Sequence, residues 1–101
     1  MIRHEVIVRV KPGVSREIIE RTLREVSVLL LGIPGVEGVR SGTNNAPSYR
    51  HALLVVDLAD ETALNRMVRH QRHARAVQLV HRLAESTAVG SYAVGSSEYR
   101  G

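Results

Sequence analysis

The sequence predicts a small α+β domain in which helices pack on one face of an antiparallel sheet. The prediction depends on stretches that alternate like strands, stretches whose apolar residues recur at helical spacing, and turn residues between them. At 101 residues the chain suits one domain with one modest core, which we assign to residues 1–95. Residues 96–101 are polar, and we expect them to form a flexible C-terminal tail.

Composition excludes several classes of function. The chain has no Cys, so neither disulfides nor a thiol nucleophile are available. No apolar run approaches the roughly 20 residues of a membrane span, and the start lacks a signal-peptide pattern. We therefore expect a cytoplasmic protein with no membrane partner. The net charge of +4 comes from Arg spread along the chain, without interleaved aromatics, which argues against a nucleic-acid partner.

The first third of the chain reads as a strand followed by a helix. Residues 2–11 alternate, and the apolar face of this strand carries His4. Ser15 is a suitable N-cap for the next helix, and Gly32 and Pro34 end it. The apolar stripe of this helix consists of Ile19, Leu23, Val26 and Leu30.

The middle of the chain predicts two strands of different strength. Residues 36–43 form a weaker strand because glycines dilute it, and a loop follows. Residues 49–58 form the strongest strand, with Tyr49, His51 and Leu53 on one face and apolar residues on the other. A strand that is apolar on both faces is expected to be central and covered on both sides.

The last third predicts two helices and a final strand. Asp60 caps a short helix that ends near Val68, the chain turns near His70, and a longer helix runs to about Ala84. Residues 86–94 form the last strand. The order β-α-β-β-α-β is typical of the ferredoxin-like fold, with the first and third strands as central neighbours and helices on one face. A second copy is the simplest cover for the other face, so we predict a homodimer.

His73 is the leading candidate for chemistry. It stands at the head of an apolar helical stripe that continues through Val77 and Val80, so its ring is directed at the interior. Burial disfavours the imidazolium, and a neutral ring near pH 7 can act as a general base. The structural alternative is a histidine at a helix start that binds a backbone carbonyl.

The other histidines and a run of arginines are weaker candidates. His4 and His51 lie on apolar strand faces, and we expect their rings to be about 20 Å apart. It is therefore hard for both to lie in one pocket with His73. His70 and His73 have the i, i+3 spacing of a metal-binding pair, but no third ligand is evident nearby, and we assign no metal. We interpret the run of Arg66, Arg69, Arg72 and Arg75 as mostly a solvated face, with one at a pocket mouth steering an acidic substrate or a carrier-bound acyl chain.

Several short motifs, in order, resemble the stress-responsive dimeric α/β-barrel family over about residues 1–95. They are Met1-Ile2-Arg3-His4, Lys11-Pro12-Gly13, Ile33-Pro34-Gly35-Val36, His51 at the start of an apolar strand, and His70-x-x-His73. The resemblance implies a homodimeric barrel with a pocket in each subunit. Members of the family include a cofactor-independent polyketide cyclase, and a hydroxynitrile lyase has been assigned to it.

The resemblance also implies roles for particular residues. In the cyclase, a histidine that matches His73 acts with a tyrosine, and histidines that match His4 and His51 belong to the family pattern. This chain departs from the pattern, because Met67 and Val26 stand where the cyclase has tyrosines.

These expectations combine into one functional hypothesis. The chain is predicted to be a cofactor-independent cyclase or lyase for a polyketide-like or other carbonyl compound, with His73, His4 and His51 as catalytic residues and no bound metal. The residues expected to bind substrate are Val6, Leu23, Val26, Tyr49, Leu53, Met67, His70 and Val77. The alternatives are a non-catalytic dimeric protein that binds small molecules or responds to stress, and a haem or metal binder.

Overall fold

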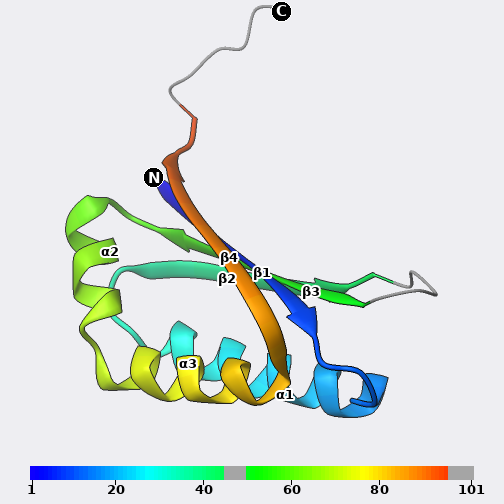
Figure 1. The fold of residues 1–101 in the computed structure, drawn as a ribbon. Coiled ribbons are helices and arrows are strands. Elements are labelled where there is room, and N and C mark those ends of the chain that lie inside the picture. Colours follow the sequence, from blue (N-terminus) through cyan, green and yellow to red (C-terminus); the bar gives the residue numbers. More distant parts are fainter. Residues whose placement is uncertain (45–49, 96–101) are drawn as a thin grey trace, which may run out of the picture.

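The computed structural model describes residues 1–44 and 50–95, and it has one four-stranded antiparallel sheet with three helices on one face (Figure 1). Tyr49 and the expected tail at 96–101 lie outside the described residues. The elements in chain order are β1 (Ile2–Val10), α1 (Arg16–Leu31), β2 (Val36–Thr43), β3 (His51–Leu58), α2 (Glu61–Val68), α3 (Gln71–Leu83) and β4 (Ala84–Ala93). The sheet order is β2-β3-β1-β4, so the prediction that the first and third strands are central neighbours is confirmed.

The core lies between the inner face of the sheet and the helices α1 and α3, which lie side by side beneath it (Figure 1). On β1 and β3, the register pairs His4 with Val56 and Val6 with Leu54, so these side chains share the inner face. The predicted apolar stripe of α1 is confirmed, because all four of its members are buried. The core is aliphatic, and it sets the spacing between the helices and the sheet.

Arg72 joins the start of α3 to the end of α1. Its Nε donates to the carbonyl of Leu29 at 2.6 Å, and its Nη2 donates to the carbonyl of Val28 at 3.1 Å. These carbonyls belong to the last turn of α1, where the regular helical hydrogen bonds end, and the Leu29 carbonyl also accepts from the Gly32 N–H at 3.3 Å. Arg72 is therefore an exception in the run interpreted as mostly a solvated face, of which Arg66, Arg69 and Arg75 are exposed.

The break between α2 and α3 is a helix cap built on His70. The His70 ring accepts the backbone N–H of Arg72 through Nδ1 at 3.0 Å, so α3 begins at Gln71. His70 and His73 thus do not share a helix face, which corrects the spacing assumed for a metal pair. The His70 side chain lies with residues of α2 at the surface, near Thr62, Asn65, Arg66 and Arg69.

Within residues 1–44 and 50–95, no segment covers the outer face of the sheet. It carries Ile7 and Leu53, which are 47% and 41% exposed and pair with each other across β1 and β3. Towards one end of this face, Arg3 Nε donates to Asp57 Oδ1 at 2.8 Å, and Arg40 lies 3.6 Å from the same carboxylate. The expectation of a third strand with two apolar faces, one of them left open by the helices, agrees with this arrangement.

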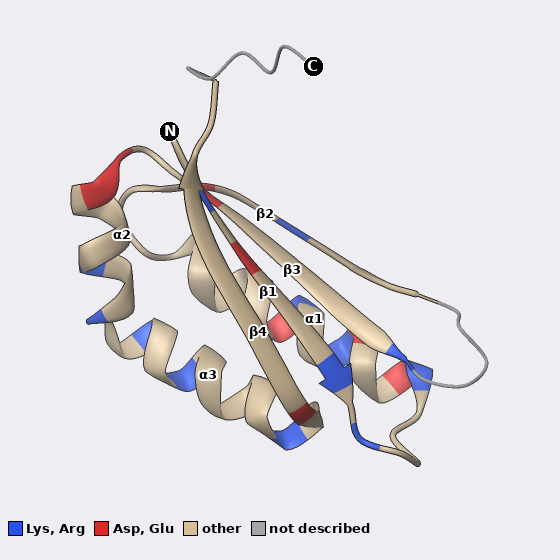
Figure 2. Ribbon diagram, turned by 45° about the horizontal axis from the view of Figure 1, so that its top comes forward, with Lys and Arg blue, Asp and Glu red and all other residues tan. Residues whose placement is uncertain are grey.

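Charge is distributed unevenly over the helices. Between Glu61 and Glu85 the sequence has Arg and His but no acidic residue, and Figure 2 shows basic positions along α2 and α3. In the part of the chain that the structure describes, no helix has the length and apolar character needed to cross a membrane.

Candidate active site

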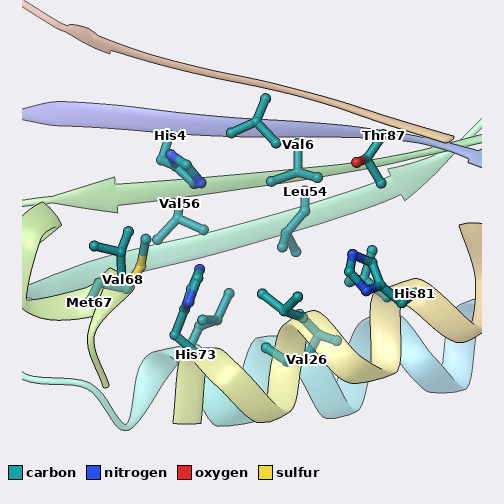
Figure 3. Close-up of a pocket in the computed structure, with 15 residues that line it drawn as sticks. His4, Val6, Val26, Leu54, Val56, Met67, Val68, His73, His81 and Thr87 are labelled. Atoms are coloured by element: carbon teal, nitrogen blue, oxygen red, sulfur yellow. The ribbon is translucent and has the colours of Figure 1, made fainter. Parts of the chain in front are cut away.

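A cavity of about 310 Å³ lies between the inner face of the sheet and the helices (Figure 3). Its walls come from both layers and are mostly aliphatic. The lining residues are His4, Val6, Val26, Leu30, Leu54, Val56, Met67, Val68, His73, Ala76, Val77, Val80, His81, Thr87 and Val89. A concave, largely apolar space with a few polar groups is the usual form of a small-molecule site.

His4 enters the cavity from the sheet. The alternation of β1 places it on the inner face, and the register places it beside Ser91 of β4. The His4 Nδ1 and the Ser91 Oγ are hydrogen-bonded at 2.6 Å. This bond occupies one ring nitrogen and fixes the plane of the ring, so Nε2 is the nitrogen available to a ligand.

His73 enters the cavity from the opposite wall. It lies in the first turn of α3, whose start is set by the His70 cap, and its ring rises towards His4 (Figure 3). The two histidines therefore face one another across the cavity, one from the sheet and one from a helix. Met67 and Val68 at the end of α2 close the cavity beside them.

Burial shifts the titration of both histidines. Desolvation lowers the pKa of His73 below its ordinary value of 6.5. Desolvation is also the larger cause of the lowered pKa of His4, and repulsion between the charged forms of His4 and His73 adds to it. Both rings are therefore neutral near pH 7, and each then has one nitrogen that donates and one that accepts a hydrogen bond.

Six of the residues selected from the sequence lie in the lining of this cavity. They come from different elements: β1, α1, the end of α2, and α3. These residues are His4, Val6, Val26, Met67, His73 and Val77.

The structure places four of the other residues outside the cavity lining. Leu53 and His51 lie on the outer face of β3, since the register pairs them with Ile7 and Arg9, and Leu54 occupies the cavity position instead. Leu23 is buried in the core but is not part of the cavity lining, and His70 is the helix cap described above. Tyr49 lies outside the described residues.

Two polar lining residues were not selected from the sequence. These residues are His81 of α3 and Thr87 of β4. A helical repeat of about four residues links His73, Val77 and His81, and alternation links Thr87, Val89 and Ser91. Extended along α3 and β4, these two patterns predict that His81 and Thr87 line the same cavity as His73.

Among the described residues, no group of three or more His, Cys, Asp or Glu side chains is arranged to hold a metal ion.

The fold and cavity define a ferredoxin-like α+β domain with a largely apolar cavity between sheet and helices. The chain belongs to the stress responsive A/B barrel domain family (Dabb), and the sequence model of this family matches residues 2–94. The resemblance inferred from the short motifs is thereby confirmed. Among curated proteins, none matches this chain.

Solved structures with a similar fold are distant in sequence. A protein from Arabidopsis thaliana is 18% identical, with 98% of this chain and 100% of that chain covered and a TM-score of 0.83. A dimeric ferredoxin-like protein of unknown function from Thermobifida fusca is 22% identical, with coverages of 92% and 90% and a TM-score of 0.77. The hydroxynitrile lyase from Passiflora edulis is 16% identical, with coverages of 97% and 96% and a TM-score of 0.78. At these identities, the likeness establishes the fold.

Proposed function

We propose that this protein is a cofactor-independent lyase or cyclase that acts on a small carbonyl compound, with His73 as general base and His4 as the group that binds the carbonyl oxygen. The observation that carries the proposal is the opposed pair of neutral histidines in an aliphatic cavity. The similar fold of the Passiflora edulis hydroxynitrile lyase supports a lyase or related reaction.

The proposed first step is proton removal next to a carbonyl. The lone pair of the neutral His73 ring takes the proton, the C–H bond breaks, and its electron pair forms an enolate. When the Ser91 hydroxyl donates to His4 Nδ1, the His4 Nε2–H is free to donate to the enolate oxygen. With the Ser91 hydroxyl as donor, the bond holds His4 in the tautomer that the step requires.

The enolate then has two outcomes, depending on the substrate. In a cyclase reaction its carbon attacks a second carbonyl of the same molecule, a C–C bond forms, and protonated His73 returns the proton to the new alkoxide. In a lyase reaction the enolate expels a leaving group from the adjacent carbon, and His73 protonates that group. Neither course consumes a redox equivalent or a cofactor.

His4 takes the place that a tyrosine has in the cyclase of this family. Among the described residues that line the cavity there is no tyrosine, and Met67 and Val26 contribute only apolar surface. A neutral imidazole N–H is a hydrogen-bond donor, as a phenol is, so the change of residue preserves the function of binding the oxygen. The substrate is expected to be mainly apolar, because the walls offer few other polar groups.

The test is deuterium exchange at the α-carbon of medium-chain methyl ketones in D₂O, followed by NMR. We expect wild-type protein to accelerate exchange and His73→Gln to slow it by about 10²-fold or more, as for loss of a positioned base. The control is His70→Asn, which removes a histidine outside the cavity and keeps a residue suited to an N-cap. If wild-type and His73→Gln proteins exchange the ketones equally, the proposal is wrong and a purely binding function is favoured.

We also propose that two copies of the chain pair through the outer face of the sheet. The exposed apolar residues Ile7 and Leu53 at its centre support this, as does the dimeric state stated for the similar Thermobifida fusca protein. The cavity opens on the other side of the sheet, so pairing leaves both sites accessible. An acyl chain bound to a carrier protein would reach the cavity along the basic α2–α3 side, and we include it among the candidate substrates.

A further inference from the structure

A second polar position lies at the far end of the same cavity. Figure 3 shows His81 of α3 rising towards Thr87 of β4, at the end away from His4 and His73. The lining residues between the two ends are aliphatic, including Val6, Leu54 and Val80. The proposed chemistry uses only the His4–His73 end, so it leaves this second pair unexplained.

The separation of the two polar ends follows from the regular elements that carry them. His81 follows His73 by eight residues in α3, which is about 12 Å along a helix that rises 1.5 Å per residue. Thr87 precedes Ser91, the partner of His4, by four residues in β4, which is about 13 Å along a strand. The helix and the strand thus place the second polar pair at the same distance from the first.

We infer that His81 and Thr87 form a recognition site for a hydroxyl group at the distal end of an elongated substrate whose carbonyl lies between His4 and His73. This inference rests on the proposed function, which places the carbonyl at the other end. The substrate class is therefore a molecule with an apolar middle and a hydrogen-bonding group at each end.

The chemistry of the two side chains favours a hydroxyl as the distal group. A threonine hydroxyl can donate and accept a hydrogen bond, an imidazole ring can donate one, and an alcohol is complementary to both. A carboxylate is disfavoured, because His81 lies near the C-terminus of α3, where the helix dipole is negative, and Glu85 follows shortly after.

The accessibility of the two ends sets the direction of entry. His81 is exposed, whereas His4 and His73 are partly buried, so we place the mouth of the cavity at the His81 end. A substrate would enter with its carbonyl first, pass the aliphatic walls, and leave its hydroxyl at the mouth. Substrate length is then selected by the fixed distance between the two polar pairs.

The experiment compares methyl ketones of increasing alkyl chain length, each with and without a terminal hydroxyl. Dissociation constants are measured by NMR titration, and α-carbon exchange is measured on the same samples. We expect the terminal hydroxyl to tighten binding by about 2- to 10-fold, the effect of one net hydrogen bond, and only at one chain length. Thr87→Val and His81→Leu should each reduce this preference, because each removes one of the two partners.

The matched control is Ser86→Ala, which removes a hydroxyl from the outer face of the same strand. The inference is overturned if the hydroxyl gives no advantage at any chain length, if its advantage is independent of length, or if both cavity variants keep it. Exchange of the ketones without a length-dependent preference would overturn this inference alone. If the protein prefers the hydroxylated ketone at one chain length but does not exchange the α-proton, the recognition site is supported and the proposed chemistry is wrong. If the protein binds none of the ketones, both are wrong.

Discussion

Arg72 lies so close to Gly32 that it determines whether Gly32→Ala stabilises or destabilises the protein. We expect the substitution to destabilise the protein when Arg72 is present and to stabilise it when Arg72 is replaced by alanine. Gly32 is the C-cap of α1 and has ordinary right-handed backbone angles, φ −79° and ψ −2°, so alanine is compatible with its conformation. A Cβ at this position, however, would lie 2.4 Å from the Nε and Cζ atoms of Arg72. Gly32→Ala must therefore displace the guanidinium rather than strain the backbone.

The cost can be worked out from the bonds that Arg72 would lose. Its guanidinium donates to the carbonyls of Leu29 and Val28, and hydrogen bonds to charged groups contribute about 1.5–3 kcal/mol each. Because Arg72 is only partly buried, solvent replaces much of this, and we expect Gly32→Ala to destabilise the fold by about 1–3 kcal/mol in total. In an Arg72→Ala background no guanidinium blocks the new Cβ. Gly32→Ala should then stabilise the protein by about 0.4–1 kcal/mol, because alanine lowers the conformational entropy of the unfolded chain.

The assay is urea unfolding of the four proteins of this double-mutant cycle, at one protein concentration so that any association contributes equally. The reasoning is refuted if Gly32→Ala destabilises both backgrounds by the same amount, because the cost would then not pass through Arg72. It is also refuted if the single variant is as stable as the wild type.

Three further predictions follow from the site and the sheet. Burial lowers the pKa of His73 and His4 below 6.5, so just below that pH the unfolded chain binds more protons than the folded chain. The contribution of the two neutral histidines to the free energy of unfolding is complete above pH 6.5 and is lost as the pH falls through the lowered pKa values. Urea unfolding measured across this pH range checks this prediction. Ser91→Ala should slow α-carbon exchange without unfolding the protein, since it frees the His4 tautomer, and unchanged exchange would contradict that role. Leu53→Lys should convert a dimer to a monomer in light scattering, whereas Val28→Lys on the helical side should not; a dimeric Leu53→Lys protein would refute the proposed interface.

The proposed mechanism and the proposed recognition site make different demands on the protein. The His4–His73 end must exclude water, because the neutral state of both rings depends on desolvation. The His81–Thr87 end must remain open for entry, and its hydrogen bonds compete with solvent. One cavity can serve both functions because exposure rises along α3, from the partly buried His73 to the exposed His81.

The local pattern of the sequence was sufficient for the elements and their order. Ser15 and Asp60 cap helices where the sequence placed them, with the N–H groups of Ile18 and Ala63 as donors. These features depend on interactions among residues close in the chain, such as a hydroxyl or carboxylate accepting an N–H three positions later. The apolar stripe of α1 was also readable, because helical periodicity alone determines which of its residues face the core.

The residues of the site were only partly predictable from the sequence, and β3 shows why. Alternation correctly separates His51 and Leu53 from Leu54 and Val56, but both faces are apolar, so the pattern does not say which face the helices cover. Choosing the wrong face exchanges Leu54 for Leu53 and places His51 in a cavity that it does not enter. On β1, where only one face is clearly apolar, His4 was assigned to the face that the cavity uses.

The sequence by itself determined the order of helices and strands, the buried stripe of α1 and the inward direction of His73. Tertiary structure alone decided that His4 and His73 meet, that Ser91 binds His4, and that Arg72 caps a distant helix. The physical reason is the range of the interactions. Periodicity and capping act over a few residues, whereas these contacts join residues far apart in the chain and exist only once the sheet register and the packing of α3 on α1 are set.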